Sequence, residues 1–155
     1  MLGTLLILMK LEFLILKYLN RMANKNEFTI RQEQEKRFYY DQSISQPIKL
    51  TFPNLESITI KFQFLYEGYP QETEINLTEK DKAFFKFKCI NKDCILGGYD
   101  LTGEIYEAVR KKMDKTTGSS ICDGWQDYER FRAQNHHCLC NMTYEVYFKY
   151  SLPNN

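Results

Sequence analysis

An alternation of apolar and polar positions runs through the middle of the chain and predicts antiparallel strands. In residues 57–65, isoleucine and phenylalanine occupy every second position, with threonine, lysine and glutamine between them, and residues 142–150 show a similar alternation. A period of two with β-branched and aromatic residues is typical of a half-buried strand. From Phe38 onward the pattern favours strands, and the further strand-like segments are residues 47–52, residues 72–77 and residues 83–89.

A helical period appears in residues 101–113 and predicts the main helix of the fold. The apolar positions on its inner face are Leu101, Ile105, Ala108 and Val109. Asp100 is expected to cap the start of this helix, and the basic residues 110–112 complement the negative end of its dipole. Residues 115–120 are expected to form a polar turn, after which a final strand closes the sheet. These elements predict an α+β domain with an antiparallel sheet.

The first twenty residues are strongly apolar but carry charges at Lys10, Glu12 and Lys17. A membrane-spanning helix needs about 20 predominantly apolar residues, and a signal peptide has basic residues before its apolar core. We therefore expect an apolar helical segment over residues 1–21, which would contact a membrane surface only if residues 1–20 are genuine. The alternative places the natural start at Met22, which leaves a single domain over residues 22–155.

The charge of the chain is almost balanced, and this restricts its partners. The 155 residues include 21 Lys and Arg against 20 Asp and Glu, so no overall field draws the protein onto nucleic acid. The length excludes a large multidomain enzyme. We recognise no glycine-rich phosphate loop, no His-Glu-x-x-His motif and no nucleophile with an obvious base, so we do not expect an enzyme. Without an export signal, we expect a cytoplasmic protein.

The cysteines are the most informative residues of the chain. All five lie in its C-terminal half, and they are Cys89, Cys94, Cys122, Cys138 and Cys140. An odd number without an export signal is unsuited to a disulfide framework. The spacing of two local pairs around Cys122 favours a structural Zn²⁺ site, with residues 91–93 forming the turn inside the first pair. The alternatives are buried unligated cysteines and redox-active or nucleophilic cysteines.

The identity of the fourth ligand is the open question of this predicted site. Cys140 is in phase with the core positions of the last strand, whereas Cys138 lies at the mouth of that strand. We therefore predict the ligand set Cys89, Cys94, Cys122 and Cys138, which leaves no open position for catalysis. Cys140 and His137 are the alternative ligands.

The segment that follows Cys122 mixes aromatic and charged side chains and is a candidate interaction surface. Its anchor residues are Trp125, Tyr128, Arg130 and Arg132. Aromatic and arginine side chains are common anchors of protein interfaces and of single-stranded nucleic acid platforms. A nucleic-acid site would combine the two arginines with residues 110–115, but the acidic residues nearby repel phosphates. The alternative for Trp125 is that it covers the zinc site as part of a small core.

Four sequence elements together resemble a loosely defined group of small uncharacterised bacterial proteins with a four-cysteine zinc-ribbon-like module. These elements are residues 84–94, 97–101, 122–125 and 138–150. The resemblance implies a zinc-binding module at residues 83–150 and a bacterial source, although Cys140 departs from the pattern. We predict a zinc-stabilised binding or adaptor module that contacts another protein, with nucleic-acid binding as the alternative.

Overall fold

The computed structural model describes residues 28–66, 68–125 and 137–151. It confirms an α+β fold with an antiparallel four-stranded sheet. The N-terminal segment 1–21 lies outside the described residues, as do the candidate interaction residues Tyr128, Arg130 and Arg132. In the part of the chain that is described, no helix is long and apolar enough to cross a bilayer.

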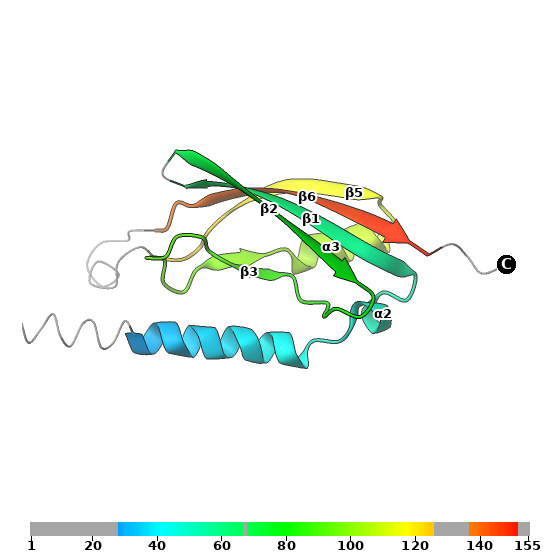
Figure 1. The fold of residues 1–155 in the computed structure, drawn as a ribbon, viewed down its shortest axis with the longest axis horizontal. Coiled ribbons are helices and arrows are strands. Elements are labelled where there is room, and N and C mark those ends of the chain that lie inside the picture. The colour runs from blue at the N-terminus through cyan, green and yellow to red at the C-terminus, as the bar shows by residue number, and fades with distance from the viewer. Residues whose placement is uncertain (1–27, 67, 126–136, 152–155) are drawn as a thin grey trace, which may run out of the picture.

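In the described part of the chain, two helices are followed by four strands, a third helix and two further strands. They are α1 (residues 28–44), α2 (Ile48–Thr51), β1 (Leu55–Tyr66), β2 (Tyr69–Thr78), β3 (Lys86–Lys88), β4 (Gly98–Asp100), α3 (Thr102–Arg110), β5 (Lys115–Ile121) and β6 (Asn141–Tyr150). Figure 1 shows three layers: the large sheet, a middle layer that contains β3 and α3, and α1 on the far side of that layer.

The large sheet has the strand order β2-β1-β6-β5, with antiparallel pairs throughout. In its centre Ile60 lies between Ile75 of β2 and Val146 of β6. One face carries the buried apolar side chains, which include Ile58, Ile60, Phe62, Phe64, Met142, Val146 and Phe148. The strands predicted at residues 57–65, 72–77 and 142–150 are thus present. The prediction that the last strand closes the sheet is wrong, because β6 lies between β1 and β5.

The segment 115–120, predicted as a polar turn, forms the edge strand β5. Its hydroxyl-bearing residues pair with β6 in a continuous register from Lys115 opposite Tyr147 to Ile121 opposite Asn141. An edge strand with one face in water needs no apolar alternation, and threonine is favoured in strands. The lack of an apolar pattern therefore reflects exposure rather than a turn.

A small sheet of β3 and β4 packs against the buried face of the large sheet. The ring of Phe87 in β3 contacts that of Phe62 edge-on at 4.6 Å between centroids, and Tyr99 in β4 lies 5.7 Å from Phe64. β3 is shorter than the predicted strand 83–89, because only Lys86–Lys88 pair with β4. The predicted strand nevertheless delivers Cys89, which follows β3 directly.

α3 corresponds to the helix predicted at residues 101–113, although it covers only Thr102–Arg110. Its buried residues are Ile105 and Ala108. The carboxylate of Asp100 accepts a hydrogen bond of 2.9 Å from the N–H of Thr102, although Leu101 occupies the formal cap position and makes no side-chain cap. Asp100 thus satisfies one of the free N–H groups at the helix start.

The main helix of the structure is α1, which the sequence pattern does not predict. Every side chain of residues 28–44 is exposed or half-buried, so no broad apolar stripe marks this helix. The strand pattern expected from Phe38 onward is therefore wrong for residues 38–44. It is also wrong for residues 47–52, where Pro47 precedes the short helix α2 and only Ile48 of the helix is buried.

Candidate metal centre

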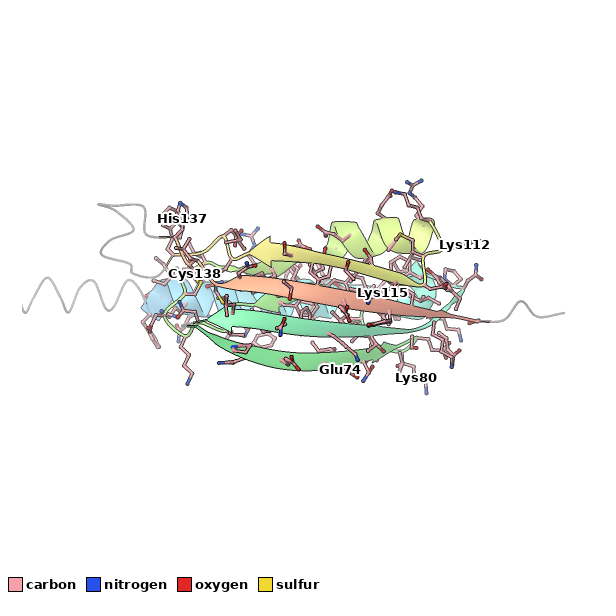
Figure 2. The ribbon with its side chains drawn as sticks, turned by 90° about the horizontal axis from the view of Figure 1, so that it is seen from above. Glu74, Lys80, Lys112, Lys115, His137 and Cys138 are labelled. Atoms are coloured by element: carbon pink, nitrogen blue, oxygen red, sulfur yellow. The ribbon has the colours of Figure 1, made fainter. Side chains whose placement is uncertain are left out.

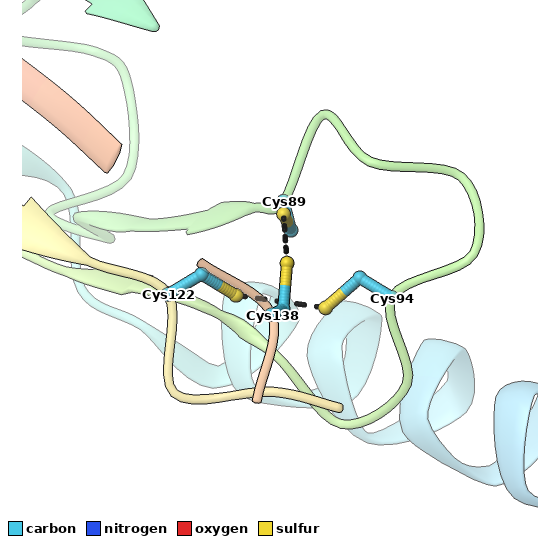
Figure 3. A group of neighbouring side chains, drawn as sticks. All are labelled: Cys89, Cys94, Cys122 and Cys138. Atoms are coloured by element: carbon cyan, nitrogen blue, oxygen red, sulfur yellow. Dashed lines mark hydrogen bonds between the residues drawn. The ribbon is translucent and has the colours of Figure 1, made fainter. Parts of the chain in front are cut away.

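Four cysteine side chains converge beyond one end of the large sheet (Figure 3). The Sγ atoms of Cys89, Cys94, Cys122 and Cys138 all lie within 4.8 Å of one another. The Sγ atoms of Cys94 and Cys122 are 3.5 Å apart, and those of Cys89 and Cys138 are 3.7 Å apart. Figure 2 shows Cys138 at the end of the sheet opposite to Lys112 and Lys80. These are the four residues predicted as ligands.

The spacing of the sulfur atoms fits a metal ion. A tetrahedral ion with metal–sulfur bonds of about 2.3 Å has sulfur–sulfur edges of about 3.8 Å. A disulfide would need sulfur atoms about 2.05 Å apart, and all five cysteines are free. Cys94, Cys122 and Cys138 are buried, whereas Cys89 is half-buried. The group therefore offers four soft donors at a spacing that a tetrahedral ion requires.

Asn91 shapes the turn between the first two cysteines. Its side-chain oxygen accepts a hydrogen bond of 2.9 Å from the N–H of Asp93, and its carbonyl accepts one of 3.1 Å from the N–H of Cys94. Its Nδ2 donates to the Sγ of Cys138 at 3.6 Å. Asn91 is only 4% exposed. This residue therefore folds Cys94 back toward Cys89 and also holds a ligand from a distant segment.

Two glycines let the backbone approach the sulfur atoms. A Cβ on Gly97 would collide with the Sγ atoms of Cys94 and Cys122, and a Cβ on Gly124 would collide with Gly97 and with the Sγ of Cys94. The N–H of Gly124 donates to the Sγ of Cys122 at 3.5 Å. Any residue with a side chain at these two positions would thus enter the volume that the sulfurs occupy.

Trp125 joins the segments that carry the cysteines. Its N–H and carbonyl exchange hydrogen bonds of 2.9 and 2.7 Å with Ile95, one residue after Cys94. It also forms an isolated bridge with His137, and the indole stacks on the imidazole at 4.3 Å between centroids. Trp125 is half-buried, so it belongs to the framework of the site and is only partly available as an interaction anchor.

The two alternative ligands lie outside the group of four. His137 is exposed and stacks on Trp125. Cys140 is buried, and its carbonyl accepts hydrogen bonds from the N–H of Cys122 at 3.0 Å and from the hydroxyl of Tyr99 at 3.1 Å. Burial raises the pKa of the Cys140 thiol to about 11. Cys140 thus occupies the core position expected from its phase with the last strand.

The hydrogen bonds within the cluster lower the pKa of Cys122 and raise that of Cys94. Hydrogen bonds from Cys89 and Cys94 lower the pKa of Cys122 to about 4, and the N–H of Gly124 adds to this effect. The hydrogen bonds of Cys94 with Cys122 and Cys89 raise the pKa of Cys94 above its ordinary value. A second buried thiolate beside the first is unfavourable without a compensating charge. A divalent cation would supply that charge and displace the remaining protons.

Three of the basic residues considered for nucleic-acid binding, Arg110, Lys111 and Lys115, are engaged in ion pairs. Glu107 pairs with Arg110 at 2.7 Å and with Lys111 at 2.9 Å, and this lowers the pKa of its carboxyl group to about 2. Lys115 pairs with Glu145 at 2.8 Å. These pairs offset part of the positive charge of residues 110–115.

The structure adds residues that the sequence reasoning did not single out. Gln34 and Arg31 of α1 hydrogen-bond to the loop that carries Cys94. No pattern in α1 signals these long-range contacts. Gly97 and Gly124, by contrast, each follow a cysteine closely in the sequence, and that proximity is a signal of close backbone approach to a sulfur.

No protein-family model matches this chain, and no curated protein or solved structure is found to match it. The resemblance to a bacterial group with a zinc-ribbon-like module therefore stays a prediction. What the chain shows by itself is a cluster of four cysteines with the spacing of a metal site. The chemistry of that cluster is the basis for assigning a function.

Proposed function

We propose that Cys89, Cys94, Cys122 and Cys138 bind one structural Zn²⁺, and that the ion fixes the end of a protein-interaction module. The observation that carries this proposal is the convergence of four thiols from separate segments to within 4.8 Å. Thiolate ligands in a tetrahedral arrangement favour zinc over calcium or magnesium, which prefer oxygen. The ion would connect the small sheet to β5 and β6.

A structural role follows from the number of ligands. Four thiolates complete the tetrahedron of zinc and leave no position for a water molecule, which a catalytic zinc keeps open. The contribution of the ion is therefore to stability. Structural zinc contributes on the order of 10 kcal/mol in small zinc peptides.

Exposed apolar side chains near the cysteines support a protein partner. Leu65 and Ile121 flank Asn141 from the two neighbouring strands, and Leu139 precedes it by two positions. Their exposed fractions are 54%, 64% and 76%. An apolar patch beside a rigid site is typical of protein interfaces. The ion pairs of Arg110, Lys111 and Lys115 give no comparable support to nucleic-acid binding.

Metal content measured on cysteine variants tests the zinc site. Protein purified from its own gene should contain about one zinc ion per chain, measured by elemental analysis. Serine substitutions at each of Cys89, Cys94, Cys122 and Cys138 should lower this ratio. Cys140→Ser is the matched control, because Cys140 is a buried cysteine outside the group of four. Equal metal loss in the control and in the four variants would contradict the assignment.

A second measurement tests the partner. The apolar patch predicts that Leu139→Asp and Ile121→Asp abolish capture of a protein partner by the zinc-loaded chain, whereas Thr117→Asp on the same face of β5 leaves capture intact. Binding of single-stranded or duplex nucleic acid that weakens steeply with salt would instead support the alternative. Capture that survives both patch substitutions would remove the patch as the interface.

A further inference from the structure

Several polar contacts hold α1 to the rest of the protein. Its inward positions include Arg31, Gln34, Phe38 and Asp41, and all four are only half-buried. An isolated helix of this length is marginal in water, so the contacts that dock it also maintain it. The attachment of α1 therefore depends on the conformation of the residues that it contacts.

The N-terminal half of α1 contacts the backbone of the loop that carries Cys94. Gln34 accepts a hydrogen bond of 2.9 Å from the N–H of Leu96 and donates one of 3.2 Å to the carbonyl of Gly97. Arg31 donates to the carbonyls of Lys92 at 2.8 Å and of Cys94 at 3.1 Å. Figure 3 shows α1, in pale blue, behind this loop. All four bonds depend on the conformation of residues 92–97.

That conformation depends in turn on the cysteine cluster. Leu96 has a φ of 59°, a left-handed conformation that is unfavourable for a side chain of this size. The next residue, Gly97, lies against the sulfurs of Cys94 and Cys122. A strained loop persists only when its surroundings hold it. Here they are the sulfurs of the proposed ligands and the neighbouring segment of Cys122, whose Trp125 exchanges backbone hydrogen bonds with Ile95.

The C-terminal half of α1 has contacts that are independent of the loop. Phe38 packs edge-on against Phe84 at 5.0 Å between ring centroids. Asp41 lies 3.7 Å from the ammonium group of Lys86. Phe84 and Lys86 lie outside the loop of residues 92–97. Lys88, which directly precedes Cys89, also donates to Glu35 at 3.1 Å and to the hydroxyl of Tyr39 at 3.4 Å. The C-terminal half of the helix is thus attached to residues 84–88 rather than to the loop.

We infer that the loop of residues 92–97 is a docking site for α1 that forms only when the cluster binds its metal, so that metal occupancy controls the attachment of the N-terminal half of α1. This inference rests on the proposed zinc site. The coupling is reciprocal by thermodynamic linkage, so weaker docking of α1 also weakens metal binding. The C-terminal half, which is anchored through Phe38, stays attached in both states.

Hydrogen exchange on the full chain, with bound zinc and after chelation, tests this coupling. Zinc removal should accelerate exchange of amides in residues 29–36 by about tenfold, while β1 and β6 keep their protection. Unchanged exchange in α1, in protein whose zinc binding and removal have been measured, would overturn the inference and leave the zinc site standing. Equal loss of protection in β6 would contradict a selective effect of the metal on the N-terminal half of α1. Protein that binds no zinc would refute both.

Two glutamines of the same helix provide a matched pair of variants. Gln34→Ala removes both bonds to the loop, and it should weaken zinc binding by about fivefold or more and accelerate exchange in residues 29–36 of the zinc-loaded protein. Gln32→Ala changes an exposed glutamine two positions away and should match the unsubstituted protein in both measurements. Identical behaviour of the two variants would overturn the role of Gln34.

Discussion

Cys89 and Cys138 lie 49 positions apart in the chain, and their Sγ atoms are 3.7 Å apart. Cys89 follows the small sheet at the end of β3, and Cys138 precedes β6 in the large sheet. The aromatic contacts of Phe87 with Phe62 and of Tyr99 with Phe64 already bring the two sheets together. An ion bound by both cysteines would therefore fasten the sheets at one end.

Asn91→Asp is expected to weaken metal binding. The aspartate keeps the oxygen that accepts from the N–H of Asp93, but it loses the N–H donor to the Sγ of Cys138 and adds a negative charge beside the thiolates. Loss of such a partner of a metal ligand costs about tenfold or more in affinity. Competition titration with a chelating dye measures this. Asn54→Asp, at an exposed asparagine, should leave the affinity unchanged, and an equal effect at both positions would refute the role of Asn91.

Gly97→Ala is expected to destabilise the metal-loaded protein by about 1–3 kcal/mol, the usual cost of overpacking. The new methyl group would collide with the Sγ atoms of Cys94 and Cys122, so metal content should fall as well. Gly103→Ala is the control, because a Cβ there meets nothing within 4 Å. Alanine inside α3 should stabilise by up to about 1 kcal/mol. Urea denaturation and elemental analysis check both variants, and equal stability changes would contradict the close approach at Gly97.

Metal binding at neutral pH is expected to release protons. The pKa of Cys94 is raised by its hydrogen bonds to Cys122 and Cys89, so this thiol is protonated in the metal-free protein and must lose its proton to bind zinc. Affinity should therefore increase as the pH rises through the neutral range. Isothermal titration calorimetry in buffers of different ionisation enthalpy measures the release, which should be about one proton or more per ion. Heats that are independent of the buffer would exclude this mechanism.

The stability of the metal-free protein should also depend on pH through Cys122. Its pKa is lowered from 9.0 to about 4 by the thiols of Cys89 and Cys94. A group with a lowered folded-state pKa contributes stability that is fully present above the unfolded value and is lost as the pH falls through the folded value. The contribution of Cys122 should therefore decline as the pH falls from about 9 to about 4. Urea denaturation of the metal-free Cys122→Ser variant should show a weaker pH dependence over this window.

Asp100→Ala is expected to lower the free energy of unfolding by about 1 kcal/mol, because it removes the acceptor for the N–H of Thr102 at the start of α3. Asp100→Asn retains an oxygen acceptor and should recover most of the loss. Chemical denaturation of the metal-loaded protein measures both variants. If the two substitutions cost the same, the cap has no role in stability.

The sequence is sufficient to predict the central strands and to group the cysteines. Residues such as Ile58 and Ile60 alternate with polar ones because one face of β1 is buried and the other is in water, and this pattern is local. Cys138 and Cys140 share the same phase along the chain, and both are buried. What separates them is that Cys138 lies further from the start of β6 at Asn141, where the chain can direct its sulfur to the cluster.

The elements that the sequence does not predict are those whose contacts are distant or polar. α1 is held by bonds such as those from Gln34 to Leu96 and Gly97, which join residues 62 or 63 positions apart. β5 lies at an edge with its hydroxyl groups exposed, so its sequence resembles a turn. In both elements the tertiary environment, rather than local propensity, decides the conformation.

X-ray absorption at the zinc edge of the purified, zinc-loaded protein tests the central claim most directly, because it counts and identifies the ligand atoms. Coordination by Cys89, Cys94, Cys122 and Cys138 predicts four sulfur neighbours at about 2.3 Å. A nitrogen neighbour at about 2.0 Å, or fewer than four sulfurs, would contradict the four-thiolate site.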